Sequence, residues 1–180
     1  LTAPPITAGL GLGETTIAEH LLGPGYRTAF FGKWHLHSHH RRYLGWSPTH
    51  GPRQQGFATA VEDFGSHPYG KAKLATLTRV GEFHPDGITK KAVAYVRQPH
   101  DRPFFLMVSH FYVHTPVKTS SEWLRKKYAS VIPRSAPKRR ERIEYAAFLE
   151  TLDHHVGELL TAVEQAGLKK DTLVVFMSDN

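Results

Sequence analysis

The chain has 180 residues, which is long enough for one domain with a substantial hydrophobic core. Its 40% hydrophobic and 22% charged residues are ordinary for a globular protein and exclude a chain that is disordered throughout. The net charge of +7 favours anionic partners, and the absence of cysteine excludes disulfides, thiolate metal sites and a thiol nucleophile within these residues. No apolar run reaches the length needed to span a membrane, and the first residues do not resemble a signal peptide.

The first predicted elements are a short helix and a buried strand. Thr16 and Glu19 form a capping box that begins the helix, and Gly23 ends it. Residues 26–31 are mostly aromatic and apolar, contain no acidic residue and lie between glycines. This pattern predicts a strand that is covered on both faces.

Residues 37–73 are rich in His, Arg, Gly and Pro and show no periodicity, which predicts a long irregular loop across the surface. Asp86 is placed to cap a helix whose apolar residues share one face. The apolar run of residues 104–108 then predicts a second buried strand.

The last third of the chain predicts two further helices and a third strand. Residues 120–128 indicate a short helix, and residues 143–163 show apolar residues at spacings of three and four, typical of a long amphipathic helix. Residues 172–177 predict a third buried strand. Helices that alternate with apolar strands favour an α/β fold with a largely parallel sheet flanked by helices.

Polar side chains follow each predicted strand, in the pairs Lys33 and His35, His110 and His114, and Asp179 and Asn180. A parallel sheet would gather all three pairs at the edge where ligands bind. An ammonium group binds charged oxygens, imidazoles transfer protons, and carboxylate and amide oxygens are ligands for Ca²⁺ or Mg²⁺. Together these groups suit the hydrolysis of an anionic ester. We assign His110 a structural role.

Three parts of the chain carry a family resemblance. GYRTA at residues 25–29 followed by GKWHL at residues 32–36 resembles the second signature of the sulfatase family, and residues 103–116 and 145–180 resemble two later blocks in the expected order. The resemblance implies an alkaline phosphatase-like fold, with residues 1–180 as part of a single catalytic domain truncated at both ends. It implies a parent activity of sulfuric ester hydrolysis on sulfated carbohydrates or aryl sulfates.

The resemblance also implies a role for each site residue. Lys33 and His35 would contact the sulfate and a formylglycine nucleophile, and His35 would take a proton from the covalent intermediate. His114 would contact the ester and protonate the leaving alcohol. Asp179 and Asn180 would be ligands of a bound calcium, with magnesium as an alternative. The formylglycine, made from Cys or Ser, is expected outside this chain.

The sequence departs from the family pattern in two places. The first signature, Cys or Ser followed by x-Pro-x-Arg, should precede Gly25 and does not, and His37 stands where the family usually has Gly. Ser135 begins a segment with the same loose spacing, but it lies downstream of His114 in a basic stretch, so we do not expect it to be the nucleophile. We expect these residues alone not to turn over substrate. The family suggests a periplasmic, secreted or lysosomal location.

Three alternatives stay open. A phosphate or phosphonate ester hydrolase of the same superfamily would share most of the contacts to a tetrahedral anion. The sequence HLHSHH at residues 35–40 approaches the HxHxDH motif of zinc hydrolases, with His39 in place of Asp. A basic patch composed of Arg134, Lys138, Arg139, Arg140 and Arg142 would suit a non-catalytic anion-binding module. No nucleic-acid motif accompanies this patch, so we expect neither a nucleic-acid nor a membrane partner, and the oligomeric state is undetermined.

Overall fold

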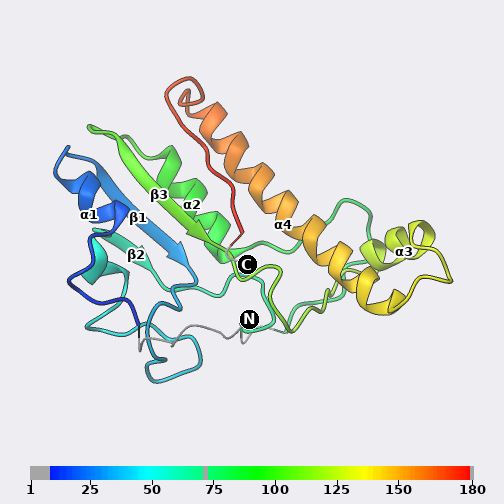
Figure 1. The fold of residues 1–180 in the computed structure, drawn as a ribbon. Coiled ribbons are helices and arrows are strands. Elements are labelled where there is room, and N and C mark those ends of the chain that lie inside the picture. The colour runs from blue at the N-terminus through cyan, green and yellow to red at the C-terminus, as the bar shows by residue number, and fades with distance from the viewer. Residues whose placement is uncertain (1–8, 71–72, 179–180) are drawn as a thin grey trace.

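A parallel sheet forms the centre of the computed structural model, which describes residues 9–70 and 73–178. Its strands are β1 (Arg27–Gly32), β2 (Thr59–Val61) and β3 (Phe104–Ser109), in the order β2-β1-β3. Helices lie on both sides of the sheet (Figure 1). The prediction of an α/β fold with a largely parallel sheet is confirmed, and both of the first two predicted strands are present.

The central strand β1 is covered on both faces, as predicted. Phe30 faces α1 (Ile17–Leu22), whereas Ala29 and Phe31 face α2 (Gly87–Arg97), because successive strand side chains point to opposite faces. The side chains packed with them are Ala18, Trp34 and Phe57 on the first face and Ile88, Ala92 and Tyr95 on the second.

Both predicted helix caps form. The hydroxyl of Thr16 accepts a hydrogen bond from the Glu19 N–H at 3.1 Å, and the Glu19 carboxylate accepts one from the Thr16 N–H at 2.8 Å. Asp86 caps α2 by accepting a hydrogen bond from the Thr89 N–H at 2.8 Å. These bonds satisfy backbone donors that the first turn of a helix leaves unpaired.

The two remaining helices are α3 (Glu122–Val131) and α4 (Arg139–Gln165). The long helix α4 packs against α2 along part of its length and against α3 near its beginning (Figure 1). It therefore forms an outer layer over the face of the sheet that α2 covers. None of the helices in the described ranges is both long and apolar enough to cross a membrane.

Two predictions about the path of the chain are wrong. Residues 172–177 form no strand, and Leu173 is 89% and Phe176 73% exposed. A strand requires a hydrogen-bonded neighbour, and the described sheet ends at β3 without pairing to this segment. The segment instead runs back beside α4 (Figure 1), where Phe176 lies near Leu152.

The loop of residues 37–73 is also not wholly irregular. It contains a 3-10 helix over Pro52–Gln55 and the strand β2, whose three residues are too few to produce a recognisable alternation.

Candidate active site

The carboxyl ends of β1 and β3 lie side by side, so Lys33 and the segment after Ser109 begin at the same edge of the sheet. The Lys33 N–H donates a hydrogen bond to the Ser109 carbonyl at 2.8 Å. Gly32 has a φ of 113°, and a Cβ at this position would overlap the Ser109 carbonyl. Only glycine allows the two strands to approach this closely where the candidate site begins.

His114 lies in the loop after β3, with its side chain exposed and its Nδ1 held by neighbours. This nitrogen is 2.7 Å from the Thr115 carbonyl oxygen and 3.0 Å from the hydroxyl oxygen of Tyr69. Because a carbonyl oxygen can only accept, the contact with Thr115 assigns a proton to Nδ1. The other ring nitrogen, Nε2, is therefore the one that can exchange a proton with a ligand.

His67 is buried beneath His114 and holds its backbone. Its Nε2–H donates to the His114 carbonyl oxygen at 2.9 Å, and its Nδ1 accepts from the Tyr69 N–H at 3.1 Å. Burial lowers the pKa of His67; the hydrogen bond to the His114 carbonyl opposes this, and the nearby charges of His114 and Lys33 lower it further. His67 is therefore a neutral imidazole with its proton on Nε2.

A row of aromatic rings joins His35 to this centre. His35 is exposed and has a φ of 42°, in the left-handed region that histidine adopts more readily than most residues. Its ring centroid is 5.3 Å from that of His39, which is 4.7 Å from Tyr43. Tyr43 in turn lies 5.2 Å from Tyr69, the tyrosine that contacts His114. Lys33 and His114 both lie close enough to His67 to interact with it electrostatically, whereas His35 is linked to His114 only through this row of rings.

The unusual His37 is accommodated by its neighbours. Its ring stacks on His50 with centroids 4.4 Å apart, and its backbone pairs with Gly9 in an antiparallel bridge. A Cβ on Gly9 would lie 2.6 Å from the His37 ring, so the glycine leaves room for this side chain. The Trp34 indole N–H donates to the His50 carbonyl at 3.0 Å, which fixes the loop onto the core.

Behind this centre lies a buried polar layer around Asp86. The Asp86 carboxylate accepts hydrogen bonds from the Ser66 N–H at 2.7 Å and the Thr89 hydroxyl at 2.8 Å, and it lies 3.8 Å from His110. Burial alone would raise the pKa of Asp86, but these hydrogen bonds and the neighbouring His110 hold it below its usual value. The layer supports the loop after β3, because the Ser66 hydroxyl also lies 2.7 Å from the Tyr112 hydroxyl.

The sequence did not single out His67 or Tyr69. Both lie in the loop of residues 37–73, for which no element was predicted, and they become neighbours of His114 only through the fold. The one available signal was a histidine and a tyrosine flanking Pro68 within a long loop, since such loops carry functional residues disproportionately often.

The predicted calcium ligands, Asp179 and Asn180, lie outside the described residues. The side chains described around Lys33 and His114 are ammonium, imidazole and phenol groups, whereas calcium requires six to eight oxygen ligands. The described part of the site therefore does not itself fit calcium.

The zinc alternative based on residues 35–40 gains no support. Within the described ranges, three ligand-bearing side chains come together closely enough to hold an ion only on α4, at His154, His155 and Glu158.

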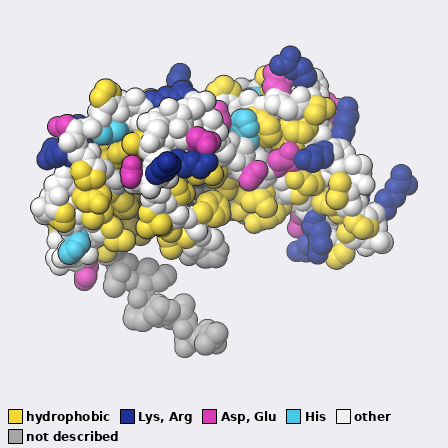
Figure 2. Space-filling model, turned by 90° about the horizontal axis from the view of Figure 1, so that it is seen from above, with side chains coloured by type: hydrophobic (Ala, Val, Ile, Leu, Met, Phe, Trp, Pro, Cys, Tyr) yellow, Lys and Arg dark blue, Asp and Glu magenta, His cyan; other side chains and the backbone are white. Residues whose placement is uncertain are grey.

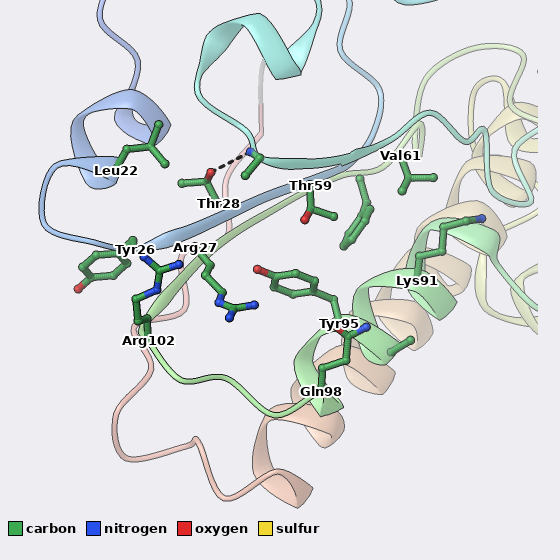
Figure 3. A pocket seen from close by; sticks show the side chains of 13 residues that line it. Leu22, Tyr26, Arg27, Thr28, Thr59, Val61, Lys91, Tyr95, Gln98 and Arg102 are labelled. Carbon is green, nitrogen blue, oxygen red and sulfur yellow. Dashed lines mark hydrogen bonds between the residues drawn. The ribbon is translucent and has the colours of Figure 1, made fainter.

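A surface hollow runs along β1, with Tyr26 and Phe31 among the residues that line it (Figure 3). Arg27, Tyr95 and Arg102 are among the side chains that line it, whereas Lys33, His35 and His114 do not. Thr28 at its rim accepts a hydrogen bond from the Ala58 N–H at 3.0 Å. This hollow is therefore separate from the candidate active site.

The predicted basic patch belongs to another part of the surface. Lys and Arg side chains gather at the end of the molecule that carries α3 and the beginning of α4 (Figure 2). Arg134, Lys138 and Arg140 are exposed there. Arg139 instead donates a hydrogen bond to the Ile132 carbonyl at 3.1 Å, in the loop between α3 and α4. The patch is remote in the fold from the end of β1.

Comparison with known proteins shows which family the chain resembles. Residues 2–180 match the family model described as Sulfatase. An ulvan-active sulfatase of Formosa agariphila is 30% identical over 98% of this chain and 38% of its own length. Human arylsulfatase A is 31% identical over 98% of this chain and 37% of its own length. The chain thus spans less than two fifths of these curated relatives.

Solved structures show the same fold. A chain described as Ps i-CgsB in complex with k-i-k-neocarrahexaose superimposes with a TM-score of 0.61 at 20% identity, covering 89% of this chain and 38% of that one. A Bacteroides thetaiotaomicron protein described under the metabolism of multiple glycosaminoglycans gives a TM-score of 0.63 at 19% identity. The match covers 92% of this chain and 41% of that one. These likenesses confirm the predicted alkaline phosphatase-like fold. The family match over almost the whole chain shows that it belongs to the sulfatase family.

Proposed function

We propose that the protein containing this chain hydrolyses sulfuric esters, and that residues 1–180 form part of its single catalytic domain. The observation that carries the proposal is that Lys33 and the loop with His114 follow adjoining ends of the parallel strands β1 and β3, in a chain whose Sulfatase match covers residues 2–180. The names of two relatives, an ulvan-active sulfatase and an arylsulfatase, support sulfated carbohydrates or aryl sulfates as the substrate class.

Each described side chain has a chemical role in this proposal. The Lys33 ammonium binds a sulfate oxygen and offsets its charge. His114 donates a proton from Nε2 to the leaving alcohol, because its Nδ1 proton is already engaged by the Thr115 carbonyl oxygen. His35 accepts a proton in the second half of the reaction, after the alcohol has left. Tyr69 and His67 position His114 through its ring and its carbonyl.

The remaining chemistry depends on groups that the described residues do not contain. A formylglycine outside this chain would supply the nucleophile, and a Ca²⁺ ion, or Mg²⁺, held by Asp179 and Asn180 with further oxygen ligands, would neutralise sulfate charge. A periplasmic, secreted or lysosomal location follows from the family and stays a prediction.

The test uses the full-length protein containing this chain, with 4-nitrophenyl sulfate as the substrate. Lys33→Ala should lower kcat/KM by at least about 100-fold, as expected when a charged hydrogen bond in the transition state is lost. The matched control is Lys126→Ala, whose side chain is 74% exposed on α3. Equal activity of both variants would overturn the assignment of Lys33.

The nearest second candidate is phosphate ester hydrolysis, which the same cationic groups would support because sulfate and phosphate are both tetrahedral anions. Assaying 4-nitrophenyl phosphate beside the sulfate decides between them. A kcat/KM for the phosphate above that for the sulfate would replace the first proposal by the second.

A further inference from the structure

A compact group of metal-ligating side chains lies on α4, apart from the residues assigned to ester hydrolysis. It consists of His154, His155 and Glu158, whose ligand atoms all lie within 4.8 Å of one another. The carboxylate oxygen Oε2 of Glu158 is 2.9 Å from Nδ1 of His155 and 3.7 Å from Nε2 of His154. Helical spacing explains the arrangement, because residues three and four positions apart share a face.

We propose that His154, His155 and Glu158 form a second metal site, which binds a divalent transition metal of the zinc class. Tetrahedral bonds of about 2.0–2.1 Å place neighbouring ligand atoms about 3.3 Å apart. The two distances to Glu158 bracket this separation, and all three ligand atoms already lie within 4.8 Å of one another, so side-chain adjustment can bring them to a common ion. Two imidazoles and a carboxylate are a ligand set of zinc sites that keep a fourth position for water.

The two histidines are held in place before any ion binds. The side chain of His155 is fully buried, so its ring is fixed by the packing around it. The ring of His154 stacks on Phe83 with centroids 4.0 Å apart and planes 6° from parallel. The carboxylate of Glu158 is 48% exposed, which gives an ion access from solvent. Preorganised ligands around an open position lower the cost of ordering the site.

The surroundings also favour a cation. Asp153 precedes the first ligand, and the buried carboxylate of Asp86 interacts electrostatically with His155. An ion at this position would hold the ring of His154 against Phe83 and would keep its fourth position open for water. Imidazole ligands distinguish this site from the calcium ligands of the proposed function, which are oxygens.

The test is zinc titration of the purified full-length protein by calorimetry, with excess Ca²⁺ present to occupy oxygen-ligand sites. The expected result is one Zn²⁺ ion bound per chain by the three ligands, with affinity reduced at least about tenfold in His154→Gln and in Glu158→Gln. Exposed His20 and Glu14 provide the matched controls His20→Gln and Glu14→Gln, which should bind as the unchanged protein does.

Two readouts keep the result independent of folding and of ester hydrolysis. Far-UV circular dichroism of both variants should match the unchanged protein, and Zn²⁺ should raise the unfolding temperature of the unchanged protein but not of Glu158→Gln. Co²⁺ should give the absorption bands of a tetrahedral site. Equal zinc affinity in all four variants, or an absence of stoichiometric binding, would overturn the proposal, whatever the activity on sulfate esters.

Discussion

The hydroxyl oxygen of Tyr69 lies 3.0 Å from Nδ1 of His114, although 45 positions separate the two residues in the chain. Burial and a hydrogen bond with Tyr43 raise the pKa of Tyr69, so its phenol stays protonated at neutral pH. The contact orients the ring of His114 on its Nδ1 side. The proposed proton donor Nε2 therefore depends on a residue from a different loop.

Replacing Tyr69 with Phe removes this contact while keeping the ring. A hydrogen bond has a net value of about 1 kcal/mol, so kcat for an aryl sulfate should fall about fivefold with little change in KM. Tyr145→Phe is the control, because that tyrosine is 47% exposed on α4. A positioning role also predicts a change in the NMR chemical shifts of the His114 ring, which a simple loss of stability would not produce.

Gly32 should not tolerate a side chain. Its φ of 113° is strained for any L residue, and an added Cβ would overlap the Ser109 carbonyl. Gly32→Ala should therefore lower the free energy of unfolding by about 1–3 kcal/mol or more, as measured by urea denaturation. Gly11→Ala has open space around the new methyl group and should change it by less than about 0.5 kcal/mol. Similar losses in the two variants would contradict the described junction of β1 and β3.

The stability of the protein should depend on pH through His67. Burial lowers the pKa of His67 in the folded state below the value of 6.5 in the unfolded chain, so the unfolded state binds more protons between the two pKa values. Stability should therefore fall as the pH drops below 6.5 and level off once it passes the folded-state pKa.

The variant His67→Gln isolates this effect, since it removes the titrating group but keeps a hydrogen-bond donor. It should weaken the dependence of the urea midpoint on pH below 6.5, whereas His20→Gln at an exposed site should leave it unchanged. The dependence that remains comes from His110 and His154, whose pKa values burial also lowers. Asp86 does not interfere, because its lowered pKa places its own loss of stability below pH 3.8. An unchanged slope in His67→Gln would show that this imidazole is not held neutral.

The sequence predicted the elements whose signals are local. Each of these signals depends only on residues a few positions apart. They are the capping box of Thr16, the cap at Asp86 and the apolar repeat of α4, and each element formed as expected. It also placed Lys33 and His114 after neighbouring parallel strands, because the rule for parallel sheets needs only the strands themselves.

The features that the sequence did not reveal depend on contacts between distant segments. His67 reaches His114 across 47 positions, and β2 is defined by its pairing with β1 more than by its own three residues. Residues 172–177 show the converse: their apolar pattern predicted a strand, yet an apolar run does not reveal whether a pairing partner is available. Local patterns thus specify elements, and pairing decides which of them join the sheet.

This difference in environment can be measured with two phenylalanines. Phe30 is fully buried in β1, where its ring lies 5.2 Å from that of Trp34, whereas Phe176 is 73% exposed. Phe30→Ala should lower the free energy of unfolding by about 3–5 kcal/mol, because it removes buried apolar surface and leaves a cavity. Phe176→Ala in the same 180-residue chain should change it by less than about 0.5 kcal/mol. A large loss from the second substitution would mean that residues 172–177 are packed into the core, in conflict with their exposed position beside α4.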